Sequence, residues 1–112
     1  MLNFQKLDVD RSAIEFLALS VTLSGAIPRG YASLADQLRR AALSVPLNVA
    51  EGCGRPTEAD AARHHGIARG SAMECAAIVD ALRVLNTIGA DEHGRAVELL
   101  GRIVAMLTKL CR

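Results

Sequence analysis

The stretch QLRRAALSVPLNVAEGCGR, residues 37–55, decides the fold of this chain. Its polar residues recur every three or four positions from Gln37 to Glu51, and its apolar residues keep the same spacing on another side, which predicts an amphipathic helix. Pro46 has no amide hydrogen and its ring crowds the carbonyl of Ala42, so we expect this helix to kink near its middle. Two glycines at the end of the stretch are typical of a helix stop.

Signals for three further helices flank this segment. Acidic residues and a serine offer caps for the first, a proline and a threonine precede the third, and an acidic pair opens the fourth. Four amphipathic helices with short connections predict an all-α, antiparallel, up-down-up-down four-helix bundle. The expected helices run from residue 8 to about 24, from about 33 to 52 or 54, from 58 to about 88, and from 91 to the C-terminus.

Length and composition predict one domain, residues 1–112, with a single core. Apolar residues make up 51% of the chain, but only one Tyr and two Phe are aromatic, which favours close-packed helices over a sheet sandwich. No run reaches the roughly 20 apolar residues of a membrane span, and no cleavable signal is present, so we expect a cytoplasmic protein without a membrane partner. The widely spaced Cys53, Cys75 and Cys111 argue against a disulfide framework and are expected to be small buried side chains.

The first helix carries two apolar strips. Ala13, Leu17 and Val21 belong to one face, and a second strip of larger side chains lies nearly opposite. Because one core cannot bury both, we predict that the second strip contacts another subunit, the alternative being that a curved N-terminal segment covers it. The predicted subunit contacts are Phe16, Leu19 and Leu23.

In the second and third expected helices, polar residues share a helix face with apolar residues. An unpaired buried charge costs several kcal/mol, so we expect Glu51 and Glu74 to pair with Arg39, Arg40 or Arg63. Such a network would fix the register of the bundle and the kink; the alternative is a site for an anionic ligand. The predicted network consists of Gln37, Arg39, Arg40, Ser44, Asn48, Glu51, Arg63, Ser71 and Glu74.

Other motifs give no support for catalysis, a metal site or a cofactor. His64 and His65 point about 100° apart on a helix and have no matching ligand one turn away, so we expect polar surface rather than a zinc site. The turn at residues 52–55 lacks the lysine and hydroxyl of a phosphate loop. In the third helix, Gly66 and Gly70 lie in a stripe of small side chains, which suggests that a partner backbone packs against that face.

The charge pattern gives mixed indications about nucleic acid. The formal net charge is +1, which offers no global electrostatic case for binding RNA or DNA. Eleven of the thirteen basic residues are nevertheless arginine, a residue suited to forked pairing with phosphates or carboxylates. The candidate nucleic-acid contacts are Arg55, Arg69 and Arg83.

Two sequence blocks, residues 37–55 and IARGSAMEC at residues 67–75, resemble the signature of bacterial four-helix-bundle proteins first noticed in 23S ribosomal RNA intervening sequences. The resemblance covers nearly the whole chain. The chain departs from the family pattern at Asp10, where the family often carries an aromatic residue, and at His64 and His65, which replace an aromatic residue and a leucine.

The resemblance implies a homopentamer without enzymatic activity. It extends to the accessory proteins of diversity-generating retroelements, similar pentameric bundles that bind nucleic acid and a reverse transcriptase. We therefore expect an oligomeric scaffold or adaptor that binds RNA, DNA or a protein partner. The alternative is a bundle that binds a small anionic ligand through Arg40, Glu51 and Glu74.

Overall fold

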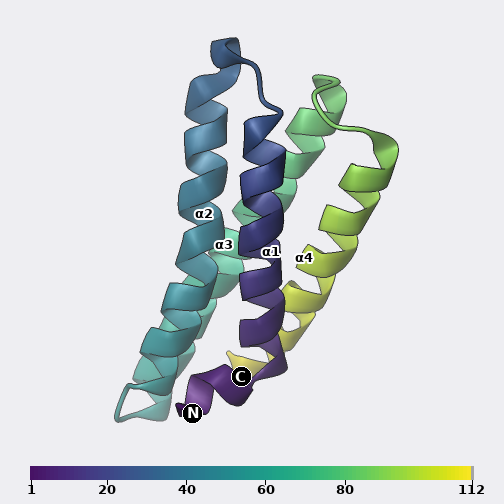
Figure 1. The fold of residues 1–112 in the computed structure, drawn as a ribbon. Coiled ribbons are helices and arrows are strands. Elements are labelled where there is room, and N and C mark those ends of the chain that lie inside the picture. The colour runs from purple at the N-terminus through teal and green to yellow at the C-terminus, as the bar shows by residue number, and fades with distance from the viewer. Residues whose placement is uncertain (112) are drawn as a thin grey trace.

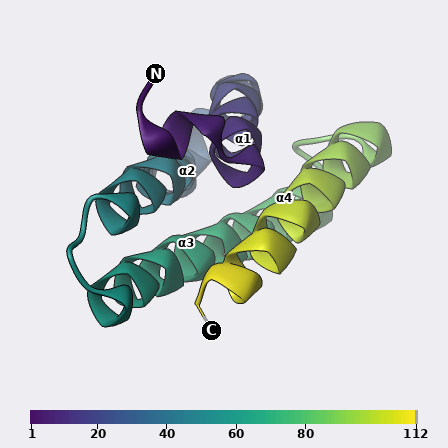
Figure 2. The same cartoon turned by 90° about the horizontal axis from the view of Figure 1, so that it is seen from below.

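The computed structural model describes residues 1–111 and contains four α-helices. Figure 1 shows successive helices running in alternate directions, with both chain termini at the same end, and Figure 2 views the bundle from that end. The predicted all-α four-helix bundle is confirmed. The helices are α1 (Asp8–Gly25), α2 (Ala32–Cys53), α3 (Glu58–Val84) and α4 (Ala90–Leu110), and the short 3-10 helices η1 (Asn3–Lys6) and η2 (Arg29–Tyr31) precede α1 and α2.

Local signals account for several of the helix ends. The side chain of Thr57 accepts a hydrogen bond from the amide of Asp60 at 3.1 Å, so the predicted threonine cap opens α3. Helix α3 ends earlier than expected because Asn86 adopts a left-handed conformation, with φ of 64°. The amide of Thr87 then donates to the carbonyl of Leu82 at 3.0 Å, as in a Schellman motif.

Pro46 lies buried inside α2. The helix continues from Ala32 to Cys53 as one element, and the kink at Pro46 remains a prediction. No helix in the described part of the chain is both long and apolar enough to cross a membrane.

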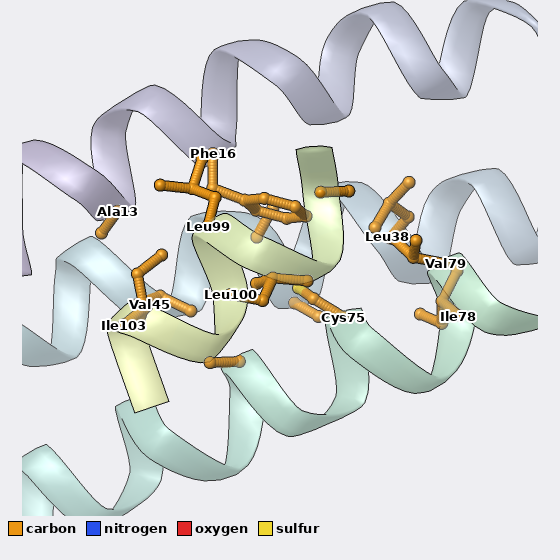
Figure 3. Packing of buried hydrophobic residues seen from close by; sticks show 14 of the residues in the cluster. Ala13, Phe16, Leu38, Val45, Cys75, Ile78, Val79, Leu99, Leu100 and Ile103 are labelled. Atoms are coloured by element: carbon orange, nitrogen blue, oxygen red, sulfur yellow. The ribbon is translucent and has the colours of Figure 1, made fainter. Parts of the chain in front are cut away.

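The core combines a few large side chains with many small ones. Phe16 of α1 packs among aliphatic side chains of the other helices, as Figure 3 shows. Helix α3 contributes the small core residues Ala68, Ala72 and Cys75, which let the helices approach closely there, and larger core residues towards its end. The largest fully buried side chains are Phe16, Leu23, Leu38, Leu82, Leu100, Ile103 and Leu107.

The prediction that Phe16 and Leu23 contact another subunit is wrong, whereas a contact at Leu19 stays a prediction. Phe16 is 1% exposed and Leu23 is 0% exposed, and Leu19 is partly buried against the same core. The helix turns this strip inward because Phe16 and Leu23 lie seven residues apart, in phase with the buried Val9. The apolar residues that α1 leaves on its surface are Ile14 and Val21.

Candidate functional site

A chain of polar side chains crosses the interface between α2 and α3. The Ser71 hydroxyl donates to Ser44 Oγ at 2.8 Å. Asn48 Nδ2 donates to the Ser44 carbonyl at 2.9 Å and to Ser44 Oγ at 3.0 Å. Asn48 Oδ1 lies 3.3 Å from Nδ1 of His64, so the chain continues onto α3. These half-buried groups therefore satisfy one another across the two helices.

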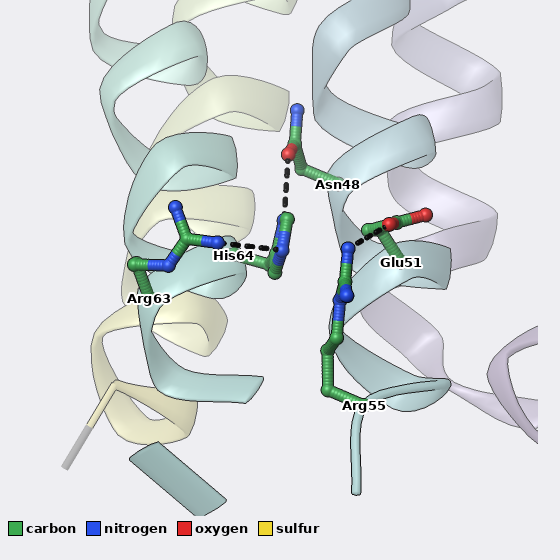
Figure 4. Close-up of polar contacts among 5 residues, drawn as sticks. All are labelled: Asn48, Glu51, Arg55, Arg63 and His64. Carbon is green, nitrogen blue, oxygen red and sulfur yellow. Dashed lines mark hydrogen bonds and ion pairs between the residues drawn. The ribbon is translucent and has the colours of Figure 1, made fainter. Parts of the chain in front are cut away.

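The partners of His64 define its tautomer. Its Nε2 lies 3.3 Å from NH2 of Arg63, as Figure 4 shows. A guanidinium group only donates hydrogen bonds, so Nε2 is the acceptor in this contact and a ring proton lies on Nδ1. That proton points toward Asn48 Oδ1. The contacts of His64 thus link Asn48 of α2 to Arg63 of α3 in a directed chain of hydrogen bonds.

The structure brings together only part of the predicted network. Ser44, Asn48, Arg63 and Ser71 belong to the polar chain. The remaining five residues lie outside it: Gln37 and Arg39 are exposed, Arg40 pairs with Asp36 at 3.1 Å, Glu51 pairs with Arg55, and Glu74 is exposed without an ion pair among residues 1–111.

The predicted pairing of Glu51 and Glu74 with Arg39, Arg40 or Arg63 is therefore wrong. Water solvates these exposed side chains, so their charges need no buried partner. Glu51 instead pairs with a residue one turn along the chain, the usual neighbour on a helix surface. Arg40, Glu51 and Glu74 form no common site for an anion.

His64 and His65 are buried, contrary to the expectation of polar surface. Both ring nitrogens of His65 are buried without a hydrogen-bond partner among the described residues. Its ring lies directly against Gly52 of α2, where an added Cβ would be 2.6 Å from Nε2. Gly52 therefore does more than end a helix: it gives the imidazole ring room between α2 and α3. The sequence signal was the departure from the family pattern at these two histidines.

Burial also changes the acidity of three groups. Burial raises the pKa of the Asp10 carboxyl, and the nearby Arg11 partly offsets this. Although Cys53 is exposed overall, partial desolvation of its thiol, and secondarily the charge of Asp10, raises the pKa of that thiol. Burial, together with the charge of Glu74, raises the pKa of Cys75 to about 12. The shifts of both thiols run opposite to the lowered pKa of a reactive cysteine.

The cysteines differ in their exposure. All three are free thiols in the structure. Cys75 is buried as expected, Cys111 is half-buried, and Cys53 is exposed, which corrects the expectation that all three would be buried. No group of three or more histidine, cysteine or acidic side chains within residues 1–111 is arranged to hold a metal ion.

The three arginines proposed to contact nucleic acid do not form one patch. Arg55 is paired with Glu51 in the turn after α2. Arg69 donates through Nε to Thr108 Oγ1 at 2.8 Å, and so ties α3 to α4. Arg83 lies 14 residues further along α3, a distance of about 21 Å at 1.5 Å per residue. The structure therefore spreads these cations along the bundle.

Large apolar side chains remain exposed on all four helices, including Val97 and Leu110 of α4. Ile14 and Val21 of α1 are 50% and 61% exposed, and Leu43 and Leu47 of α2 are 45% and 58% exposed. On α3, Ile67 and Met73 are also exposed. A Cβ added at Gly66 or Gly70 would meet nothing within 4 Å, so the predicted partner backbone does not come from this subunit.

Comparisons with known proteins agree with this architecture. Residues 5–109 match the family described as 23S rRNA-intervening sequence protein. A similar solved structure is that of a protein of unknown function from the S23 ribosomal protein family of Bacteroides thetaiotaomicron VPI-5482. The two chains are 19% identical, with a TM-score of 0.87 over 93% of this chain and 98% of the other, a likeness of fold alone. A comparison with curated proteins finds no match.

Proposed function

We propose that this chain, which belongs to the 23S rRNA-intervening sequence protein family, is a non-enzymatic scaffold that assembles with copies of itself. The observation that carries the proposal is the exposed apolar stripe of α1 and α2, defined as Ile14, Val21, Leu43 and Leu47. Burying apolar surface contributes about 25 cal/mol per Å², so large aliphatic side chains on two neighbouring helices favour association. The family resemblance implies five subunits, and this is the stoichiometry that we propose.

The polar chain between α2 and α3 supports a structural role rather than chemistry. Its hydrogen bonds join Ser71, Ser44, Asn48, His64 and Arg63 to one another, which leaves few groups for a substrate. A satisfied polar network favours one register of two helices over others. We therefore assign this chain to the alignment of α2 on α3.

The test of self-association is the mass of the purified protein by light scattering after size exclusion. We expect a species of about five times the 11.9 kDa subunit at micromolar concentration. Leu43→Ser combined with Leu47→Ser should shift the population toward the monomer, since both side chains would lose their apolar surface.

The matched control is Val84→Ser, because Val84 is an exposed aliphatic residue at the end of α3, outside the stripe. This variant should keep the wild-type mass. A wild-type protein that stays monomeric over the whole concentration range would refute the proposal. An unchanged mass of the double variant would refute the role of the α2 stripe.

Adaptor activity is the second part of the proposed function. The oligomer would present its remaining surface to RNA, DNA or a protein partner, as the family resemblance implies. The arginine-rich composition supports a partner that carries phosphates or carboxylates. Fluorescence anisotropy with labelled single-stranded and structured RNA, at low and near-physiological salt, tests this part. Binding that weakens steeply with salt would support it, and no binding at low salt would remove RNA from the candidates.

A further inference from the structure

A surface hollow between α1 and α4 brings together two arginines from distant parts of the chain. Arg11 lies in the second turn of α1, and Arg102 lies in the second half of α4. The hydroxyl-bearing Ser12 is next to Arg11, and Met106 is one turn beyond Arg102. The hollow is lined by Asp8, Arg11, Ser12, Arg102, Ala105 and Met106.

Both guanidinium groups are available to an external anion. Arg102 is exposed and makes no ion pair or hydrogen bond with any described side chain. Arg11 pairs only with Asp8, at 3.4 Å, and the two side chains are 64% and 82% exposed. Exposed pairs of this kind contribute only about 0–1 kcal/mol. An incoming anion can therefore displace the Asp8 carboxylate from Arg11.

We propose that this hollow binds a phosphate group, with Arg11 and Arg102 donating from two sides and Ser12 supplying a hydroxyl. A guanidinium group presents parallel N–H donors that match the oxygens of phosphate, so two such groups on different helices hold it more firmly than one. The apolar carbons of Ala105 and Met106 line the same hollow. Asp8 acts as an internal competitor for Arg11.

The test measures phosphate binding by NMR titration with inorganic phosphate and pyrophosphate. We expect saturable shifts of the amides around Arg11 and Arg102. Arg102→Ala should weaken binding about tenfold, because it removes one charged donor. Arg95→Ala is the matched control, since Arg95 is an exposed arginine two turns earlier on α4, outside the hollow, and it should leave affinity unchanged.

Asp8→Asn distinguishes a built site from general attraction to positive charge. The substitution removes the internal competitor for Arg11 and a negative charge in the hollow, so it should tighten phosphate binding. Only the first effect needs Arg11, so Asp8→Asn should improve binding less in an Arg11→Ala background than in the wild-type protein. Equal losses in Arg95→Ala and Arg102→Ala, or no saturable shift at the hollow with either anion, would overturn the proposal.

Two further arms identify the source of the phosphate. Single-stranded RNA that binds more tightly than pyrophosphate and loses affinity in Arg102→Ala would assign the hollow to a nucleic-acid backbone. Its salt slope should then fall by about 0.7 for the lost contact. Vesicles of phosphatidylcholine with phosphatidic acid test a lipid headgroup in the same way. Binding of pyrophosphate alone would assign the hollow to a small phosphorylated ligand.

Discussion

Asp10 is a carboxylate whose surroundings favour its neutral form. It is 8% exposed at the start of α1, and burial raises its pKa above the ordinary value. A raised pKa in the folded state means that the fold binds the proton more tightly than the unfolded chain does. The stability gained from this proton is present at low pH and is lost as the pH rises through the folded-state pKa.

Asp10→Asn should therefore stabilise the protein at neutral pH. The amide keeps the shape of the side chain and removes the buried charge, so we expect a gain of roughly 0.5–1 kcal/mol at pH 7. The gain should shrink as the pH falls and the wild-type carboxyl becomes protonated. Urea unfolding of both proteins at neutral and acidic pH measures it. A less stable variant at pH 7 would mean that the carboxylate makes a favourable contact in the fold.

Glu74 is the opposite case, because its charged side chain is exposed to water. It is exposed and unpaired among residues 1–111, so Glu74→Ala should change the free energy of unfolding by less than about 0.5 kcal/mol. Phe16→Ala, at a fully buried site, should cost about 3–5 kcal/mol in the same urea titration. A loss of stability near 3 kcal/mol in Glu74→Ala would instead mean that Glu74 forms a buried ion pair, as its position in the sequence suggested.

The cysteines should separate by reactivity. Cys53 is exposed, whereas Cys75 is buried with a pKa raised to about 12. The thiolate is the reactive form of a cysteine. At mildly alkaline pH the Cys75 thiol is still protonated, and its burial keeps reagents away from it. We expect iodoacetamide to label Cys53 in the native protein and Cys75 only after denaturation, as read by peptide mass spectrometry. Native labelling of Cys75 at the rate of Cys53 would contradict its burial.

At the scale of helices, the contact of Gly52 with His65 sets how closely α2 and α3 approach. A Cβ at Gly52 would lie 2.6 and 2.7 Å from two ring atoms of His65 and 3.1 Å from the Ala61 carbonyl oxygen. Gly52→Ala gains about 1 kcal/mol of helix propensity but adds an overpacking cost of about 1–3 kcal/mol. We expect a net loss of stability.

A double-mutant cycle isolates this contact. In a His65→Ala background the ring is gone, so Gly52→Ala should cost less than it does in the wild-type protein. The contact with the Ala61 carbonyl remains, and the relief should therefore be partial. Gly70→Ala is the control, since a Cβ there meets nothing within 4 Å of this subunit. Additive effects of the Gly52 and His65 substitutions would show that the two residues do not share one packing contact.

The spacing of polar and apolar residues predicted the four helices well, but it did not always predict which face of a helix is buried. The pattern around Pro46 identified α2 because polar and apolar residues there separate cleanly. In α1 both strips are apolar, so spacing alone could not choose between Phe16 and Val21 as the inward residue. Part of the polar network was predictable, because Ser44 and Asn48 lie one turn apart. The burial of His64 was not predictable, because a histidine is expected on the surface unless the residues that face it are known.

At the scale of the whole molecule, the bundle has a filled core but also leaves large apolar side chains exposed on its surface. The core fills the space between four helices, and the polar chain joins α2 to α3. The four aliphatic side chains of the stripe on α1 and α2 are among the large apolar residues that remain on the surface. A chain of this size gains only modest stability from a single core, so burying this stripe in an oligomer would add to it substantially.

This coupling predicts that thermal stability depends on protein concentration. If only the folded chain associates, a tenfold rise in concentration adds roughly 1 kcal/mol per subunit and raises Tm by about 4–8 °C for a domain of this size. Differential scanning calorimetry over a hundredfold range of concentration measures the trend. The variant with Leu43→Ser and Leu47→Ser should have a lower Tm that no longer varies with concentration. A concentration-independent Tm in the wild-type protein would mean that the monomer alone determines stability, and the stripe would then need an occupant other than a second copy of the chain.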